Sequence, residues 1–330
     1  MNVAVIGAGA WGTALSRLLC LRGHRVTLWC REEDVRLALD ETRINERFLP
    51  GVRLPQELAV TGDLARAVTL ADTLVLAVPS QFLRGVLLGL VGHVRPGQRF
   101  VSATKGLEES TLRRMSEVVT DIFPFAPDVT VLSGPTFAPE VARDEPTALV
   151  AASSSDEAAQ LVQSSFSTAS FRIYTSGDVV GVELGGAVKN VIALAAGVAR
   201  GLGLGHNPIA AIMTRGLAEI ARLTEALGGR RDTLAGLAGM GDLVLTCTGH
   251  LSRNRHVGVE LGRGKSIQEV TANMVQIAEG VGTTHAAVAL ARRHEVEMPI
   301  AFQMERLLRG ETCPKAVVEE LMARPLKAES

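Results

Sequence analysis

The sequence of 330 residues has few aromatic side chains and no excess of charge of either sign. Aromatic residues make up 4% of the chain, too few to supply the stacking surfaces on which single-stranded nucleic acids bind. Lysine plus arginine number 34 and acidic residues 35, so the basic excess that nucleic acids or anionic membranes require is absent. The balance still permits a local basic pocket that binds one anion.

Cysteines and long apolar runs are also scarce. The four cysteines, Cys20, Cys30, Cys247 and Cys313, lie far apart and form no CxxC pair. This spacing matches neither a zinc site nor a disulfide framework and is typical of the reducing cytosol. The longest stretch without a charged residue, residues 1–16, is interrupted by glycines and has no basic start, so it resembles neither a signal peptide nor a membrane span. We expect a cytoplasmic protein with no membrane span, no nucleic-acid partner and no metal site.

The first half of the chain has the pattern of an α/β domain. A chain of this length corresponds to about two domains. Short apolar runs alternate with helical stretches, and the predicted strands are residues 3–6, 25–29, 73–78, 99–103, 129–132 and 147–152. Continuous apolar strands separated by helices predict a parallel sheet covered on both faces. We assign this domain to residues 1–180.

The composition changes after about residue 177. From there the chain is rich in Ala, Leu and Gly and has few β-branched runs. Helical periodicity predicts helices over residues 188–198, 209–226, 267–278, 284–293 and 301–308. We therefore assign residues 181–330 to a second, all-helical domain.

A glycine loop follows the first predicted strand. Gly7, Gly9 and Gly12 fit the pattern GxGxxG between a strand and a helix. In this pattern the first glycine permits a tight turn, the second lets a pyrophosphate approach the backbone, and the third lets the helix pack close to the strand. The helix start offers free N–H groups and a partial positive charge to phosphates. We predict a dinucleotide site here; the alternative is a glycine turn without a ligand.

The end of the second predicted strand bears on the choice of cofactor. An NAD site usually has Asp or Glu at this place to bind the ribose 2′-hydroxyl. Here Cys30 and Arg31 follow the strand, and Glu32 and Glu33 come just beyond. Arg31 can pair with a 2′-phosphate, so we expect both cofactors to be used, with NADPH favoured. The alternative is that Arg31 is a solvated surface charge.

One lysine interrupts the apolar helix of the second half. Lys189 and Asn190 lie in an otherwise apolar stretch. A buried, unpaired ammonium group is costly, so we expect Lys189 to face a cleft or a partner. Desolvation would lower its pKa towards a range useful for proton transfer. The alternative is a structurally paired lysine, and Asn190 is open to a structural bond with a neighbouring loop.

Two further segments offer groups for a phosphorylated substrate. Ser252 is expected to cap a helix that runs towards residue 261, with Arg253 as a planar fork for phosphate and Asn254 as an amide donor. The glycines around Asp242 are expected to hold its carboxylate in a loop. Taken alone, these residues are equally consistent with a solvated basic pair, Arg253 and Arg255, and with Asp242 as a helix cap.

The strand ends of the first half supply more candidates. Lys105 follows the strand 99–103, and ligands of parallel sheets bind at the carboxyl ends of the strands. We expect Lys105 to lie near the nicotinamide and to lower the pKa of Lys189 by charge repulsion. The loop of residues 134–138 is expected to present backbone N–H groups there.

These motifs together resemble the bacterial-type NAD(P)-dependent glycerol-3-phosphate dehydrogenases. The resemblance covers nearly the whole chain, and several motifs occur in the right order. They are GAGAWGTAL at 7–15, LPG at 49–51, AVPS at 77–80, SATKG at 102–106, GPTFA at 134–138, GVELGGAVKNV at 181–191, GLAGMGDL at 236–243 and SRN at 252–254. Phe48, Thr136 and Pro139 depart from the residues that are common in the family.

The resemblance implies a fold, a reaction and a set of site residues. It implies a Rossmann-like first domain and a helical second domain similar to that of 6-phosphogluconate dehydrogenases. The implied reaction interconverts dihydroxyacetone phosphate and sn-glycerol 3-phosphate with NAD(P)H, for phospholipid synthesis. Lys189 would be the proton donor, and the substrate contacts would be Lys105, Gly134, Thr136, Asp242, Ser252, Arg253 and Asn254. The cofactor contacts would be Gly7, Gly9, Trp11, Gly12, Arg31, Lys105, Ala138, Arg253, Ile277 and Glu279.

Two other functions remain open at this point. A dehydrogenase of the same architecture could act on a hydroxy acid or sugar acid, with a site built around a carboxylate. A redox-sensing regulator could bind the dinucleotide without turnover, but the chain shows no DNA-binding element and such a protein has no use for Lys189. The apolar helical half is also compatible with a homodimer.

Overall fold

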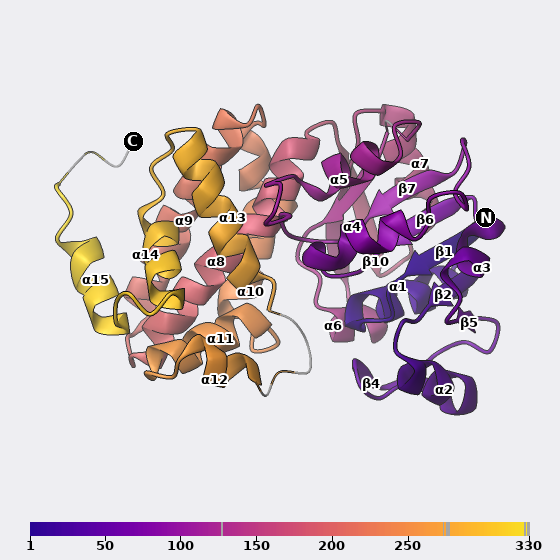
Figure 1. Ribbon diagram of the computed structural model, residues 1–330, viewed down its shortest axis with the longest axis horizontal. Coiled ribbons are helices and arrows are strands. Elements are labelled where there is room, and N and C mark those ends of the chain that lie inside the picture. The colour runs from indigo at the N-terminus through magenta and orange to yellow at the C-terminus, as the bar shows by residue number, and fades with distance from the viewer. Residues whose placement is uncertain (127, 273, 275–277, 327, 329–330) are drawn as a thin grey trace.

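The computed structural model describes all residues except 127, 273, 275–277, 327, 329 and 330. A sheet flanked by helices forms one end of the molecule, and a bundle of helices forms the other end (Figure 1). The strands of the sheet are β1 Asn2–Ile6, β2 Arg25–Trp29, β5 Ala59–Thr61, β6 Thr73–Leu76, β7 Arg99–Ser102, β8 Thr130–Ser133, β9 Thr147–Ala152 and β10 Phe171–Ser176. The predicted architecture, a Rossmann-like sheet domain followed by helices, is confirmed.

The sheet has the strand order β10-β9-β8-β7-β6-β1-β2-β5. Its helices are α1 Ala10–Leu21, α2 Glu33–Thr42, α3 Leu64–Thr69, α4 Ser80–Leu88, α5 Met115–Ile122, α6 Ala138–Ala142 and α7 Asp156–Phe166, and a small hairpin joins β3 Ile44–Asn45 to β4 Leu49–Arg53. Side chains of β1 alternate between two buried clusters, with Val3 and Val5 in one and Ala4 and Ile6 in the other. Helices therefore cover both faces, as predicted for a doubly wound sheet.

One strand runs against the predicted direction. β9 pairs antiparallel with β8, whereas β10 pairs parallel with β9. The connecting helix α6 has 5 residues and rises only about 7.5 Å, so it does not carry the chain back along the sheet before β9 begins. The expectation of an entirely parallel sheet is wrong at this pair, and β5 and β10 are strands that the sequence pattern did not reveal.

The helical half is arranged around one long helix. α8 runs from Val179 to Gly201 and packs against α9, α10, α11, α13 and α14. The bounds of the others are α9 His206–Ala226, α10 Asp242–Thr248, α11 Arg253–Gly262, α12 Ile267–Ala272, α13 Gly280–Arg293, α14 Pro299–Leu308 and α15 Pro314–Met322, with short helical turns at Arg231–Ala235 and Leu237–Gly241. The helix predicted over 267–278 ends at Ala272 as described, and part of its remainder lies outside the described residues.

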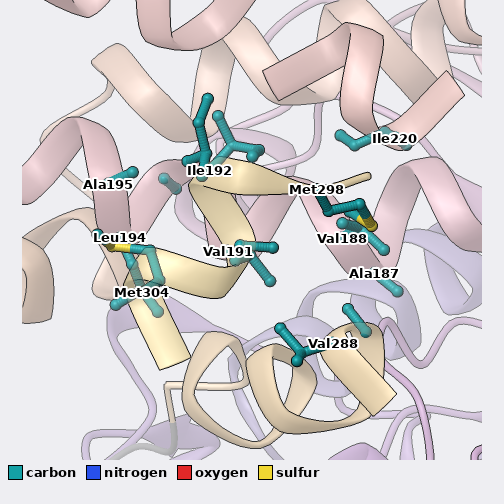
Figure 2. Packing of buried hydrophobic residues seen from close by; sticks show 14 of the residues in the cluster. Ala187, Val188, Val191, Ile192, Leu194, Ala195, Ile220, Val288, Met298 and Met304 are labelled. Carbon is teal, nitrogen blue, oxygen red and sulfur yellow. The ribbon is translucent and has the colours of Figure 1, made fainter. Parts of the chain in front are cut away.

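Helix α8 forms the core of this half. Figure 2 shows its apolar side chains against residues of α9, α13 and α14, including Ile220, Val288 and Met304. In the described part of the chain it is the one helix long and apolar enough to cross a membrane, but 89% of the apolar window is buried inside the protein. Its apolar character is therefore accounted for by its central position.

Glycines bring α8 and α11 into direct backbone contact. A Cβ on Gly258 would lie 2.1 Å from the carbonyl oxygen of Leu194 and 2.9 Å from Cα of Gly197. One turn further along, a Cβ on Gly262 would lie 2.4 Å from the carbonyl oxygen of Val198 and 3.0 Å from Cα of Gly201. We call these four glycines the glycine seam. It leaves no room for side chains between the two helices.

Substituting a seam glycine should destabilise the protein. Gly258→Ala would force α8 and α11 apart, and we expect a loss of about 2–3 kcal/mol in the free energy of unfolding, in the range of overpacked cores. Urea unfolding measures this change. The matched control is Gly85→Ala in α4, where an added Cβ meets nothing within 4 Å; helix propensity makes that change neutral or stabilising. Equal stability of the two variants would contradict the prediction.

Candidate functional site

The glycine loop between β1 and α1 has the geometry of a phosphate cradle. Gly7 has φ +114°, and a Cβ on Gly12 would lie 1.9 Å from the carbonyl oxygen of Gly7, so both positions require glycine. A Cβ on Gly9 would meet nothing within 4 Å, which leaves open space above the loop. The first turn of α1 has no side-chain cap, so its N–H groups are available to an anion. The residues present therefore fit a dinucleotide.

Two other predicted cofactor contacts lie beside this loop. Trp11 and Ala138 pack in one small cluster with Ala14 and Leu49. Nε1 of Trp11 is buried and has no hydrogen-bond partner among the described residues. A buried donor without a partner is rare in proteins and indicates a group that a ligand can satisfy.

Arg31 lies at the end of β2, as predicted, and is exposed. Its guanidinium donates two hydrogen bonds to Oε1 of Glu32, at 3.1 Å from Nε and 2.7 Å from Nη2. It also stacks over the ring of Phe82, 5.5 Å from the ring centre. Arg31 is therefore a paired surface charge rather than a freely solvated one.

Two lysines from different halves of the chain share one buried carboxylate. Nζ of Lys105 lies 2.7 Å from Oδ2 of Asp242, and Nζ of Lys189 lies 2.5 Å from Oδ1. Asp242 is 1% exposed. With both lysines protonated the three groups have a net positive charge, which favours an anion or a developing negative charge nearby.

Lys189 is buried, and its ammonium group has one N–H that makes no hydrogen bond to the described residues. Its ammonium group donates to Asp242 and, at 2.7 Å, to Oγ1 of Thr246, so one of its three N–H groups has no partner among the described residues. Desolvation by burial, opposed by Asp242 and reinforced by the neighbouring charge of Lys105, lowers the pKa of Lys189 to about 8. A proton with this pKa can leave and return near neutral pH.

Lys105 binds the predicted strand-end loop. Its ammonium group donates to the carbonyl oxygen of Gly134 at 2.8 Å and to Oγ1 of Thr136 at 3.3 Å. A Cβ on Gly186 of α8 would lie 2.5 Å from Oγ of Ser133 and 3.8 Å from Cγ of Lys105. Glycine at 186 therefore lets the lysine side chain pass close to α8.

Asp242 begins helix α10, and this differs from the loop that its glycine neighbours predicted. Gly239 and Gly241 belong to the π-helical turn Leu237–Gly241 that leads directly into α10. Thr246 was not a candidate, although helical spacing places it one turn after Asp242, where its hydroxyl donates to the carbonyl oxygen of Asp242 at 2.6 Å. An i, i+4 search from Asp242 would have found it.

The start of α11 holds the predicted Ser252, Arg253 and Asn254. Oγ of Ser252 accepts from the backbone N–H of Arg255 at 3.2 Å, which confirms the predicted cap. Arg253 is exposed, and Asn254 is buried with Oδ1 accepting from the backbone N–H of Gly280 at 2.9 Å. The asparagine thus ties the start of α11 to the start of α13.

Glu279 is the neighbour of Gly280 in the sequence, and it connects the two halves of the chain. Its carboxylate accepts from the hydroxyl of Ser80 at 2.6 Å and from its backbone N–H at 3.3 Å. Burial raises the pKa of Glu279, and the bonds from Ser80 and the charge of Arg253 oppose the rise. A Cβ on Gly106 would lie 2.4 Å from Oγ of Ser80, so Glu279 lies next to the segment that holds Lys105.

Other predictions remain without a structural counterpart. Ile277 lies outside the described residues. Asn190 is 5% exposed, and its side chain has no bond to a neighbouring loop among the described residues. The same part of the chain contains no group of three or more His, Cys, Asp or Glu side chains that could hold a metal ion.

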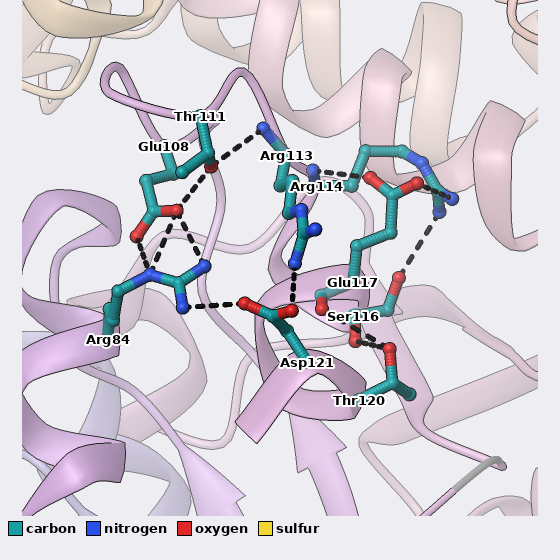
Figure 3. A network of polar contacts seen from close by, with 9 residues as sticks. All are labelled: Arg84, Glu108, Thr111, Arg113, Arg114, Ser116, Glu117, Thr120 and Asp121. Carbon is teal, nitrogen blue, oxygen red and sulfur yellow. Dashed lines mark hydrogen bonds and ion pairs between the residues drawn. The ribbon is translucent and has the colours of Figure 1, made fainter. Parts of the chain in front are cut away.

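A polar network holds the segment after Lys105 against both halves. Figure 3 shows Arg84 binding Glu108 and Asp121, at 2.9 Å and 2.7 Å. At the far end of the segment, Arg114 binds the buried Glu183 of α8 at 2.6 Å. Glu183 also accepts from the N–H and the hydroxyl of Ser116 at 2.8 Å and 2.6 Å. These bonds fix the Lys105 segment relative to the helix that carries Lys189.

Comparisons with known proteins agree across the whole chain. The family model described as NAD-dependent glycerol-3-phosphate dehydrogenase N-terminus matches residues 2–159, and the model of the C-terminus matches residues 178–319. The glycerol-3-phosphate dehydrogenase (NAD(P)+) of Koribacter versatilis is 51% identical, and that of Geobacter sulfurreducens 52%, each covering 99% of this chain and 98% of the relative. The crystal structure of glycerol-3-phosphate dehydrogenase from Coxiella burnetii has a TM-score of 0.94 at 38% identity, covering 98% of this chain and 99% of that one.

Proposed function

Because this chain belongs to the NAD-dependent glycerol-3-phosphate dehydrogenase family and is an NAD(P)-dependent oxidoreductase of that kind, we propose that Lys189 is its proton donor. The observation that supports this role is the buried Lys189 ammonium on Asp242, with a pKa of about 8 and one free N–H. In the reduction of dihydroxyacetone phosphate, negative charge develops on the carbonyl oxygen. The ammonium group stabilises that charge and then gives up its proton.

The glycine loop and its neighbours would hold the cofactor. The open space above Gly9 and the free N–H groups at the start of α1 suit the pyrophosphate. Trp11, Ala138, Arg31 and Glu279 would complete the cofactor site, and Lys105 would contact both the cofactor and the substrate. The chemistry supplied by bound NAD(P)H is hydride transfer to the carbonyl carbon of the substrate.

The start of α11 would hold the phosphate of the substrate. Ser252 caps the helix, and the N-terminal N–H groups favour an anion. Arg253 adds a planar fork that matches phosphate geometry, and Asn254 is fixed by Gly280. Lys105, Gly134, Thr136 and Asp242 would position the remainder of the substrate next to Lys189.

Arg253→Ala tests this phosphate site. We expect KM for dihydroxyacetone phosphate to rise by about 10- to 100-fold, since a charge-assisted bidentate contact contributes on the order of 1.5–3 kcal/mol. Steady-state assays of NAD(P)H absorbance measure the change. Arg200→Ala is the matched control, because Arg200 is exposed in the last turn of α8. An unchanged KM in Arg253→Ala would contradict the assignment.

We further propose where the enzyme acts and how it is organised. The product, sn-glycerol 3-phosphate, would serve glycerophospholipid synthesis in the cytoplasm. Two domains would meet near residues 180 and 181, close to the turn at Gly177 that separates β10 from α8. The apolar helical half is compatible with a homodimer, and sedimentation of the purified protein would determine its oligomeric state.

A further inference from the structure

The segment of residues 105–114, which we call the Lys105 segment, is embedded in the helical half of the molecule. Leu107 is fully buried, and it belongs to the same apolar cluster as Leu184 and Ala187 of α8. Leu112 packs against this cluster as well. The Lys105 segment thus follows a strand of the sheet in the sequence but packs with the helical half.

Backbone contacts close the Lys105 segment into a loop. An antiparallel β-bridge pairs Leu107 with Arg114. Inside the bridge, the N–H of Glu108 donates to the carbonyl oxygen of Arg113 at 2.9 Å. Leu107 comes only two positions after Lys105 in the sequence. A contact that holds Arg114 therefore also holds the backbone next to Lys105.

Glu183 of α8 holds the far end of this loop. Its side chain is 4% exposed, and Oε2 accepts from Nη1 of Arg114 at 2.6 Å. The two bonds from Ser116 use the same carboxylate. Lys189 follows six residues later on the same helix, about 9 Å along its axis. One rigid helix therefore carries both Lys189 and the anchor of the Lys105 segment.

The pKa of Lys189 depends on where Lys105 lies. The groups that act on the charge of Lys189 are the carboxylate of Asp242, the ammonium group of Lys105 and the buried thiol of Cys247. Among them, Lys105 lowers the pKa of Lys189. Because repulsion between like charges weakens with distance, withdrawal of Lys105 would raise that pKa.

We propose that Glu183 is a positioning residue that sets the place of Lys105 opposite Lys189. It acts through Arg114 and the closed loop, and it touches neither substrate nor cofactor. When its carboxylate is drawn back, the loop loses its anchor on α8 and Lys105 moves away from Lys189. This inference rests on the proposed role of Lys189 and adds a residue that controls its proton.

Glu183→Asp keeps the charge and draws the carboxylate back by one methylene group. We expect the pKa of Lys189 to rise by about 0.5, because a nearby like charge moves away. The chain contains five lysines, so NMR of protein with ¹³C-labelled lysine can follow the Cε resonance of Lys189 through a pH titration. The kcat for reduction should fall about tenfold, since a displacement of about 1 Å costs up to about 100-fold.

Two further variants separate positioning from a general effect on the fold. Glu117→Gln is the matched control, because Glu117 binds the same Arg114 at 2.9 Å but lies on α5, in the sheet half, and is 45% exposed (Figure 3). It should leave both the titration of Lys189 and kcat unchanged. Arg114→Lys keeps the charge and removes the planar fork from the other side of the contact. It should raise the pKa of Lys189 as Glu183→Asp does.

The titration distinguishes this inference from the proposed function, because it needs no turnover. An unchanged titration of Lys189 in folded Glu183→Asp or folded Arg114→Lys overturns the inference, and so does an equal shift in Glu117→Gln. If Glu183→Asp lowers only the stability, Glu183 serves the fold alone. Near-normal turnover in Lys189→Ala refutes the proton donor whatever the titration shows, and a shifted titration then still supports the positioning of Lys105 by Glu183.

Discussion

Lys189→Ala is expected to lower kcat for the reduction of dihydroxyacetone phosphate by at least about 10³-fold. General acid catalysis contributes about 10²–10⁴-fold, and stabilisation of the developing oxyanion adds to it. The binding of NAD(P)H should persist, because the bonds of Lys189 among the described residues go to Asp242 and Thr246, and neither is a proposed cofactor contact. Stopped-flow turnover and cofactor titration of the same preparation measure both quantities.

Controls and pH distinguish proton donation from a structural role. Lys315→Ala, with a side chain that is 82% exposed, should behave like the wild type. In the wild type, the pKa of Lys189 of about 8 means that the ammonium form prevails below pH 8. The rate of reduction should therefore fall as the pH rises through 8, and oxidation of glycerol 3-phosphate, which needs the neutral amine, should rise. Near-normal turnover in Lys189→Ala would rule out the role.

Asp242→Asn should have the second largest effect. The substitution keeps the shape of the side chain but removes the one charge that lies between Lys105 and Lys189. We expect kcat/KM to fall by about 10²–10³-fold, because both ammonium groups lose the partner that orients them. The loss of the charge that raises the pKa of Lys189 should move the pH limb of reduction to lower pH by roughly one unit.

Asp242→Asn should also lower the stability of the protein. Two buried or half-buried cations without their shared carboxylate should cost about 3 kcal/mol or more in the free energy of unfolding. The exposed Asp232 provides the control, and Asp232→Asn should change neither kinetics nor stability. A pH limb that stays in place in folded Asp242→Asn would show that Asp242 does not control the proton of Lys189.

The sequence predicted the parts of the fold that rely on local patterns. The glycine loop, the strands around it and the Ser252 cap each follow from a short motif, and all are present. Helix α8 was predicted only over 188–198, although it begins at Val179. The first turns of α8 contain Gly181, Gly185 and Gly186, which interrupt the helical pattern of apolar residues in the sequence. In the fold these glycines let α8 lie close to neighbouring segments.

The site was harder to predict where it depends on tertiary contact. The antiparallel direction of β9 follows from the shortness of α6. No pattern of residues in the sequence predicts that this helix is so short. Thr246 and Ser80 acquire their roles from residues distant in the sequence, Lys189 and Glu279. The shared carboxylate of Asp242 likewise joins Lys105 and Lys189, which lie 84 positions apart in the sequence. Secondary-structure propensity carries no information about such a tertiary contact.

The glycine seam has a consequence for substrate size. Gly258 belongs to α11, whose first turn holds Ser252 and Arg253, and Gly197 belongs to α8, which holds Lys189. Because backbone meets backbone at this contact, the separation between the proposed phosphate site and the proposed proton donor cannot adjust through rotamer changes. The fixed distance between the two helices would therefore favour substrates of one length. This suits a compound with one short carbon chain between its phosphate and its ketone.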